Sequence, residues 1–253
     1  MITAQVFTIG IPIYDQVDLM DIAAPCEMFF WMNQTWQSKT AKQKSAQVLL
    51  VAANTGSVTT AAGVAISPNV TFDGCPQLDM LWVPGGYPTA LKDRMNDPVF
   101  LNFLREQSKG AKFVTSVCEG ALLLASAGLL DGYKATTHWA FMSCLRRFKK
   151  IKVVRGYPRY VVNKNKDGKY VVTGGGISSG LDEALKLVEL ITDEVLGAHS
   201  GIAVAKGVQL TTQNICRSHL LRERSPAQSS VLWMILPDAR NEWPRHLCLG
   251  HFG

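Results

Sequence analysis

The sequence predicts an α/β protein with a mostly parallel β-sheet covered by helices on both faces. Short β-rich runs alternate with helix-forming segments along the chain, an arrangement typical of parallel sheets with crossover helices. Several of these runs are apolar throughout, as expected for strands that are buried on both sides. With 253 residues, 47% of them hydrophobic and 18% charged, the chain is long enough for one large core.

The first half of the chain is expected to contain three strands, a hairpin and two helices. In order, these are a strand at 4–13, a helix at 18–31, a strand at 46–52, a hairpin at 56–66, a strand at 78–83 and a helix at 97–109. The helix at 18–31 has apolar residues at near-helical spacing, and Asp15 or Asp18 is expected to cap it. Pro25 is expected in its first turn or at a kink. The polar residues 33–45 are expected to form a surface loop.

The second half alternates in the same way. Its predicted elements are a strand at 111–117, a helix from 120, a helix at 140–148, strands at 151–154, 160–162 and 170–173, a turn at 174–176 and a helix at 180–196. The last helix is long and amphipathic, so we expect it to cover one face of the sheet.

The sharpest motif is the run TSVCEGA at residues 115–121, where an apolar strand leads directly into Cys118 and then into a helix. This is the pattern of a nucleophile elbow, in which a sharp turn directs the reactive side chain out of the end of the sheet. Gly120 would let the helix and strand approach closely, and the helix N-terminus would lower the pKa of the thiol. An inert cysteine packed at a strand end is the alternative, and the strand–Cys–x–Gly–helix context favours the nucleophile.

Two other segments follow predicted strands. Gly85 and Gly86 end the strand at 78–83, where ligands bind in open α/β sheets. The N–H groups of Gly86 and Glu119 could together hold a developing negative charge, although a Pro-Gly-Gly run is otherwise only a turn. His138, in the run ATTHW, could orient or protonate a substrate, or could simply pack beside its tryptophan neighbour.

An acidic cluster, Asp15, Asp18 and Asp21, follows the first strand. A carboxylate placed over a thiolate could transfer a proton or activate water. Helix capping and a solvated face explain Asp15 and Asp18, whereas Asp21 is followed by apolar residues and lies further inside the element. Asp21 is therefore the candidate acid or base.

Composition argues against several other classes of protein. The net charge of +6 is not accompanied by a dense basic run, so nucleic acid is not an expected partner. No apolar segment is long enough to span a membrane, and the N-terminus has no secretory signal, so a cytoplasmic location is expected. None of the six cysteines forms a Cys-x-x-Cys pair, and no metal site is expected.

Five segments together resemble the ThiJ/PfpI (DJ-1-like) superfamily and occur in its order. They are residues 19–25 (LMDIAAP), 83–86 (VPGG), 115–120 (TSVCEG), 135–139 (ATTHW) and 173–177 (TGGGI). The resemblance spans residues 4 to about 213. It implies a flavodoxin-like three-layer sandwich, related to class I glutamine amidotransferases, that usually forms a homodimer.

Within the superfamily the pattern resembles the isonitrile hydratases most. The resemblance implies that Cys118 attacks the carbon of a small-molecule isonitrile to give a thioimidate, and that Asp21 handles the proton and activates water. The product would be an N-substituted formamide, and no metal or organic cofactor is implied. The resemblance places four further residues around the site: Gly85, Gly86, Glu119 and His138.

Two positions depart from related patterns. Glu119 stands where the hydratase pattern has threonine. Its carboxylate would raise the pKa of the Cys118 thiol if it faced inward, and would leave only its backbone N–H at the site if it faced outward. The protease-like branch has histidine directly after the cysteine, and the absence of that histidine argues against a proteolytic Cys-His pair built in the same way.

The resemblance ends after Gln213, so one domain is expected at 1–213. Residues 214–253 form an atypical tail that is expected to be poorly ordered. Codons for its first residues can be chosen so that another frame gives a family-like Pro-rich ending, and we hypothesise a frameshifted C-terminus.

Three other functions stay open from the sequence. AraC-type regulators have a similar N-terminal domain, but the 40 residues after Gln213 are too few for their usual paired helix-turn-helix module. A redox sensor or chaperone would oxidise Cys118 reversibly. A glyoxalase-like enzyme would use the same thiolate to attack an aldehyde.

Overall fold

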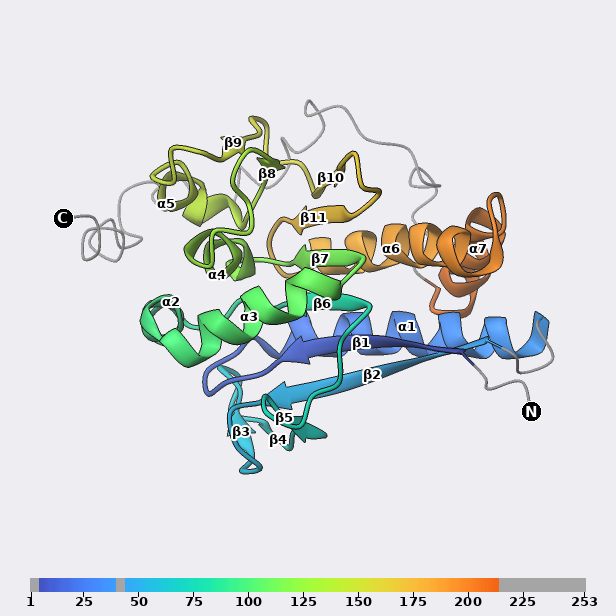
Figure 1. The fold of residues 1–253 in the computed structure, drawn as a ribbon, viewed down its shortest axis with the longest axis horizontal. Coiled ribbons are helices and arrows are strands. Elements are labelled where there is room, and N and C mark those ends of the chain that lie inside the picture. Colours follow the sequence, from blue (N-terminus) through green and yellow to red (C-terminus); the bar gives the residue numbers. More distant parts are fainter. Residues whose placement is uncertain (1–4, 40–43, 214–253) are drawn as a thin grey trace.

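The computed structural model describes residues 5–39 and 44–213 and shows one large sheet with helices on both faces (Figure 1). The sheet has seven strands in the order β10-β11-β7-β6-β1-β2-β5. Every pairing in this sheet is parallel except the one between β10 and β11. The predicted flavodoxin-like, mostly parallel sandwich is confirmed.

The central strands are short and fully buried. The strands of the sheet are β1 (Gln5–Pro12), β2 (Lys44–Ala52), β5 (Val70–Thr71), β6 (Met80–Val83), β7 (Phe113–Ser116), β10 (Tyr160–Lys164) and β11 (Tyr170–Gly174). All residues of β6, β7 and β11 are buried, because helices cover both faces of these strands. Two small sheets pair β3 (Val58–Thr59) with β4 (Ala65–Ile66), and β8 (Lys134–Ala135) with β9 (Lys152–Val153).

The helices form two groups on opposite faces of the sheet (Figure 1). One group contains α1 (Leu19–Lys39), α6 (Ser179–Leu196) and α7 (Gly201–Thr211), which pack against one another. The other contains α2 (Pro88–Asn96), α3 (Pro98–Gly110) and α4 (Gly120–Ser126). The helix expected at 140–148 is a 3₁₀ turn, η1 (Trp139–Phe141), followed by the short α5 (Met142–Leu145).

The first helix is longer than predicted. Residues 33–39 were expected to form part of a surface loop, but they continue α1. Trp36 is fully buried on this stretch, as is Met32 just before it, and the Trp36 indole N–H donates to Thr192 Oγ1 on α6 at 2.9 Å. Packing of these two side chains therefore keeps a largely polar segment helical.

Pro25 lies inside α1, beyond its first turn, where it leaves one helical carbonyl without its usual partner. A proline has no N–H to donate to the residue four positions earlier, which here is Asp21. The indole N–H of Trp82 on β6 donates to that carbonyl instead, at 2.9 Å. The start of α1 is thereby bonded to the centre of the sheet, and this bond fixes the backbone of Asp21.

Other local predictions also have clear outcomes. The predicted hairpin is present as β3 and β4, with Gly63 in a left-handed conformation at its turn. Asp97 caps α3 by accepting from two backbone N–H groups. None of the described helices is long and apolar enough to cross a membrane. The tail at 214–253 lies outside the described residues, and the domain boundary at 213 stays a prediction.

Candidate active site

Cys118 lies in a sharp turn between β7 and α4. Its φ of 55° is in the left-handed region, which residues other than glycine seldom adopt. A Cβ at Gly120 would come within 2.0 Å of the Val83 carbonyl oxygen, so only glycine fits where α4 begins. The predicted strand–cysteine–helix turn is therefore present, with glycine at the point of closest approach.

Hydrogen bonds from two other segments hold the backbone of Cys118 in this conformation. Its N–H donates to the Gly175 carbonyl oxygen at 2.8 Å. Its carbonyl oxygen accepts from Thr137 Oγ1 at 2.7 Å and from the His138 N–H at 3.4 Å. The residue is only 1% exposed, so these bonds offset the cost of an unfavourable conformation in a buried position.

The glycine pair after β6 packs directly on this turn. A Cβ at Gly85 would lie 2.9 Å from the Cβ of Cys118, so a side chain there would collide with the nucleophile. Gly86 faces Val17 in an isolated antiparallel bridge. The hydrogen bonds of this bridge are made by the residues that flank Gly86 and Val17, and not by these two residues themselves. The N–H of Gly86 is thus not used in that pairing, and its role at an anion site stays a prediction.

Asp21 projects from the first turn of α1 toward the thiol and is completely buried. Its Oδ2 accepts from the Gly85 N–H at 2.8 Å, whereas its Oδ1 has no hydrogen-bond partner within the described part of the chain. Burial, and then the charge of Asp18, raises the pKa of Asp21 well above its usual range. The acid form of Asp21 therefore persists to higher pH than that of an ordinary aspartate.

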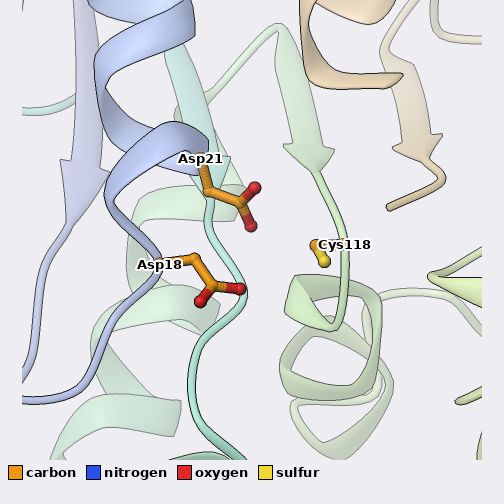
Figure 2. A group of neighbouring side chains, drawn as sticks. All are labelled: Asp18, Asp21 and Cys118. Carbon is orange, nitrogen blue, oxygen red and sulfur yellow. The ribbon is translucent and has the colours of Figure 1, made fainter. Parts of the chain in front are cut away.

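Asp18 is also part of the site, although capping was expected for it. The Cys118 sulfur and one carboxylate oxygen each from Asp18 and Asp21 lie within 4.8 Å of one another. Figure 2 shows both carboxylates at the start of α1, facing Cys118. A metal ion could be held at this spacing, but the chemistry that we propose requires none. Asp15 lies elsewhere, since its Oδ1 accepts from the Thr59 N–H at 2.8 Å.

Glu119 faces inward. Its carboxyl group is hydrogen-bonded to the Cys118 side chain, and its Oε2 lies where a Gly85 side chain would otherwise stand. Burial raises the pKa of Glu119 to about 7. Its Oε1 is 3.6 Å from His138 Nδ1, and burial lowers the pKa of that imidazole, which favours its neutral form. Glu119 therefore brings a carboxyl group to the thiol as well as a backbone N–H.

The surroundings raise the pKa of the Cys118 thiol, contrary to the lowering predicted from the helix N-terminus. Burial is the main cause, followed by the charges of Asp21 and Glu119. The N–H of Ile177 hydrogen-bonds to the sulfur and acts in the opposite direction, but it does not reverse the shift. Cys118 therefore rests as a thiol, which must lose its proton to a neighbouring group when it reacts.

Sequence reasoning missed three polar groups around the candidate active site. Ile177 supplies a backbone N–H, which gives no side-chain signal. Tyr14 is buried and donates its hydroxyl to the Pro84 carbonyl oxygen at 3.2 Å. Glu183 on α6 is completely buried, and burial followed by the charge of Asp21 raises its pKa well above the usual range. Glu183 is a charged residue on the apolar stripe of the amphipathic helix α6, and this position was a signal that could have identified it.

Replacing Glu119 by glutamine is expected to make Cys118 easier to ionise. Because the charge of Glu119 raises the pKa of the thiol, its removal should shift the midpoint of alkylation by iodoacetamide to lower pH. The difference should be largest above pH 7, since the pKa of Glu119 is about 7. Glu106→Gln, on the exposed side of α3, is the matched control. A midpoint that stays in place or moves up would contradict the expected effect.

The sequence and the fold are similar to those of known proteins. The sequence profile of the DJ-1/PfpI family matches residues 8–211. The chain is 36% identical to an isonitrile hydratase from Pseudomonas putida over 80% of this chain and 76% of the hydratase. A ThiJ/PfpI family protein from Pseudomonas syringae has a similar crystal structure, with a TM-score of 0.66 and 30% identity over 83% of this chain and 75% of that one. The transcriptional regulator GbdR of Pseudomonas aeruginosa is 32% identical over 33% of this chain and 22% of the regulator.

Proposed function

Because the chain belongs to the DJ-1/PfpI family, we propose that it is a cysteine-dependent hydratase that adds water to an isonitrile and releases an N-substituted formamide. The observation that carries this proposal is the buried Cys118 thiol facing the carboxyl group of Asp21 at the turn between β7 and α4. Similarity to an isonitrile hydratase over most of both chains supports it. By the same resemblance we propose a cytoplasmic homodimer that acts on a small molecule.

The first step adds the thiol across the terminal carbon of the isonitrile. The Cys118 sulfur forms a bond to that carbon, and the carbon lone pair takes a proton from Asp21. The thiol proton passes to Asp21 in its place, so the carboxyl group ends the step as it began. The product is a thioimidate, S–CH=N–R, bound to Cys118. The raised pKa values of both groups suit this exchange, because they disfavour ionisation of either group before the substrate arrives.

The second step adds water to the thioimidate carbon. The water oxygen bonds to the carbon, one water proton is transferred to the nitrogen, and a tetrahedral adduct, S–CH(OH)–NH–R, results. The C–S bond then breaks with its electron pair returning to sulfur, and the hydroxyl proton leaves as the formyl group forms. That proton restores the thiol, so the enzyme returns to its starting state.

A buried, largely uncharged site suits this substrate. An isonitrile is neutral and compact and does not require a cationic side chain for binding. Burial disfavours ionisation of Cys118 and Asp21, and it also limits the access of bulk water to them. The N–H groups of Gly86 and Glu119 remain our proposed donors to negative charge that develops on the substrate nitrogen.

Incubation of the wild-type protein with cyclohexyl isocyanide tests the proposal directly. We expect N-cyclohexylformamide to form in many-fold excess over the enzyme, measured by gas chromatography with mass detection. Methylglyoxal, assayed in parallel for lactate, tests the glyoxalase alternative. Turnover of methylglyoxal without turnover of the isonitrile would replace the hydratase proposal by the alternative.

A further inference from the structure

Two carboxyl groups, not one, face Cys118. Asp18 and Asp21 each bring an oxygen within the same 4.8 Å group as the sulfur, and both come from the start of α1 (Figure 2). The resemblance to hydratases assigned both proton transfer and water activation to Asp21. A second carboxylate at this distance could take over one of those two tasks.

The environments of the two carboxyl groups differ. Asp21 is fully buried, accepts the Gly85 N–H through Oδ2, and has no hydrogen-bond partner for Oδ1 among the residues that the structure describes. Asp18 is only partly buried and lies just before the first helical residue, Leu19. Burial raises the pKa of both groups, and the pKa of Asp21 is raised further by the charge of Asp18. When two interacting carboxyl groups differ in burial, the more exposed one ionises first.

We propose that Asp18 is a second catalytic residue, the general base that activates water in the hydrolysis of the thioimidate, while Asp21 serves the addition of the thiol. This inference rests on the proposed hydratase function. As the water oxygen bonds to the thioimidate carbon, Asp18 accepts a water proton and then gives it to the nitrogen. Asp18 therefore ends the step ionised, as it began, and no other reactant is needed.

The other acidic groups near the site fit this task less well. Glu119 is hydrogen-bonded to the thiol itself and is almost completely buried. Glu183 is fully buried on α6, where its carboxyl group lies against Gly174. Asp21 holds its proton after the first step. Asp18 is thus the carboxylate that combines partial exposure to water with a position beside the sulfur.

Single-turnover mass spectrometry of Asp18→Asn separates the two steps. The variant is mixed with cyclohexyl isocyanide, quenched in acid at successive times, and its intact mass is measured. We expect a Cys118 adduct, heavier by one isonitrile, to accumulate, while formamide release falls roughly 100-fold or more. Asp21→Asn should form the adduct far more slowly than the wild type. Asp93→Asn, which removes one exposed charge on α2, should match the wild type in both measurements.

Each outcome has a defined meaning. Wild-type turnover combined with unchanged turnover in Asp18→Asn would overturn the role of Asp18 and leave the hydratase function standing. Loss of both adduct and turnover in a folded Asp18→Asn would also overturn it, because Asp18 would then act in the first step. Partial recovery of formamide release in Asp18→Glu would support it. Absence of isonitrile turnover in the wild type would overturn the proposed function and this inference together.

Discussion

A Cys118→Ala variant is expected to lose isonitrile hydration by roughly 10⁴-fold or more, the scale on which removal of a catalytic nucleophile acts. Without the sulfur no thioimidate can form, and water does not add readily to an isonitrile at neutral pH. The hydrogen bonds that hold this residue use its backbone N–H and C=O, which alanine keeps. The fold should therefore persist, with a loss of about 1 kcal/mol in unfolding free energy from the missing buried atom.

The measurement pairs formamide production with thermal unfolding of the same sample. Cys75→Ala provides the control, because Cys75 is also a free thiol but lies in a different part of the structure. Hydration should survive in Cys75→Ala and vanish in Cys118→Ala, and the covalent adduct should be absent from the latter. Residual hydration near the wild-type rate in a folded Cys118→Ala would rule out Cys118 as the nucleophile.

The second large effect is expected from Asp21→Asn, which should slow adduct formation by roughly 10²- to 10⁴-fold. The amide has nearly the same shape as the carboxyl group and can still accept the Gly85 N–H, but it cannot exchange a proton with the thiol or the substrate carbon. Single-turnover adduct formation, followed by intact mass, isolates this step from water addition.

The pH dependence of the same step provides an independent check. Burial raises the pKa of Asp21, so the reactive acid form persists to higher pH than in an ordinary aspartate and is lost as the pH rises through that pKa. Adduct formation in the wild type should therefore decline on the alkaline side, and this decline should differ in Asp21→Asn because the group is no longer ionisable. Adduct formation at the wild-type rate in a folded Asp21→Asn would show that Asp21 does not transfer the proton.

The fold was predictable from the sequence because its central strands are buried on both faces. Such strands leave continuous apolar runs, and the predicted strands at 78–83 and 111–117 contain β6 and β7 of the structure. The nucleophile turn was predictable for a related reason. A strand, Cys118 and Gly120 follow one another within a few residues, so the turn is encoded locally, whereas the close contact of Gly120 with the Val83 carbonyl joins it to another strand.

The rest of the site depends on contacts between distant segments. Asp18 precedes a helix and therefore looks like a cap, and only the folding of α1 against the turn at Cys118 reveals it as a neighbour of the thiol. The Ile177 N–H reaches the sulfur from the segment after β11. The inward orientation of Glu119 depends on Gly85, which leaves room for its carboxyl group. The spacing of residues within one segment of the sequence reveals none of these contacts.

Dependence on distant contacts also explains why the first helix was predicted to end too early. Residues 33–39 are largely polar, and their helical state depends on the burial of Trp36 against α6, more than 150 residues later in the chain. Apolar spacing within one segment cannot reveal a partner at that separation. The sequence therefore indicates where α1 begins more clearly than where it ends.

The indole of Trp82 gives Asp21 a backbone attachment to the sheet that Asp18 does not share. Asp21 is anchored through its own carbonyl oxygen to β6, because Pro25 leaves that oxygen available, and its place is part of the architecture of the sheet. Asp18 lies before the helix, where its N–H donates to the Gly85 carbonyl oxygen at 3.1 Å. The backbones of the two acids are thus held by different contacts, one to β6 and one to the segment that follows it, so a change of the side chain at position 18 should leave the anchor of Asp21 in place.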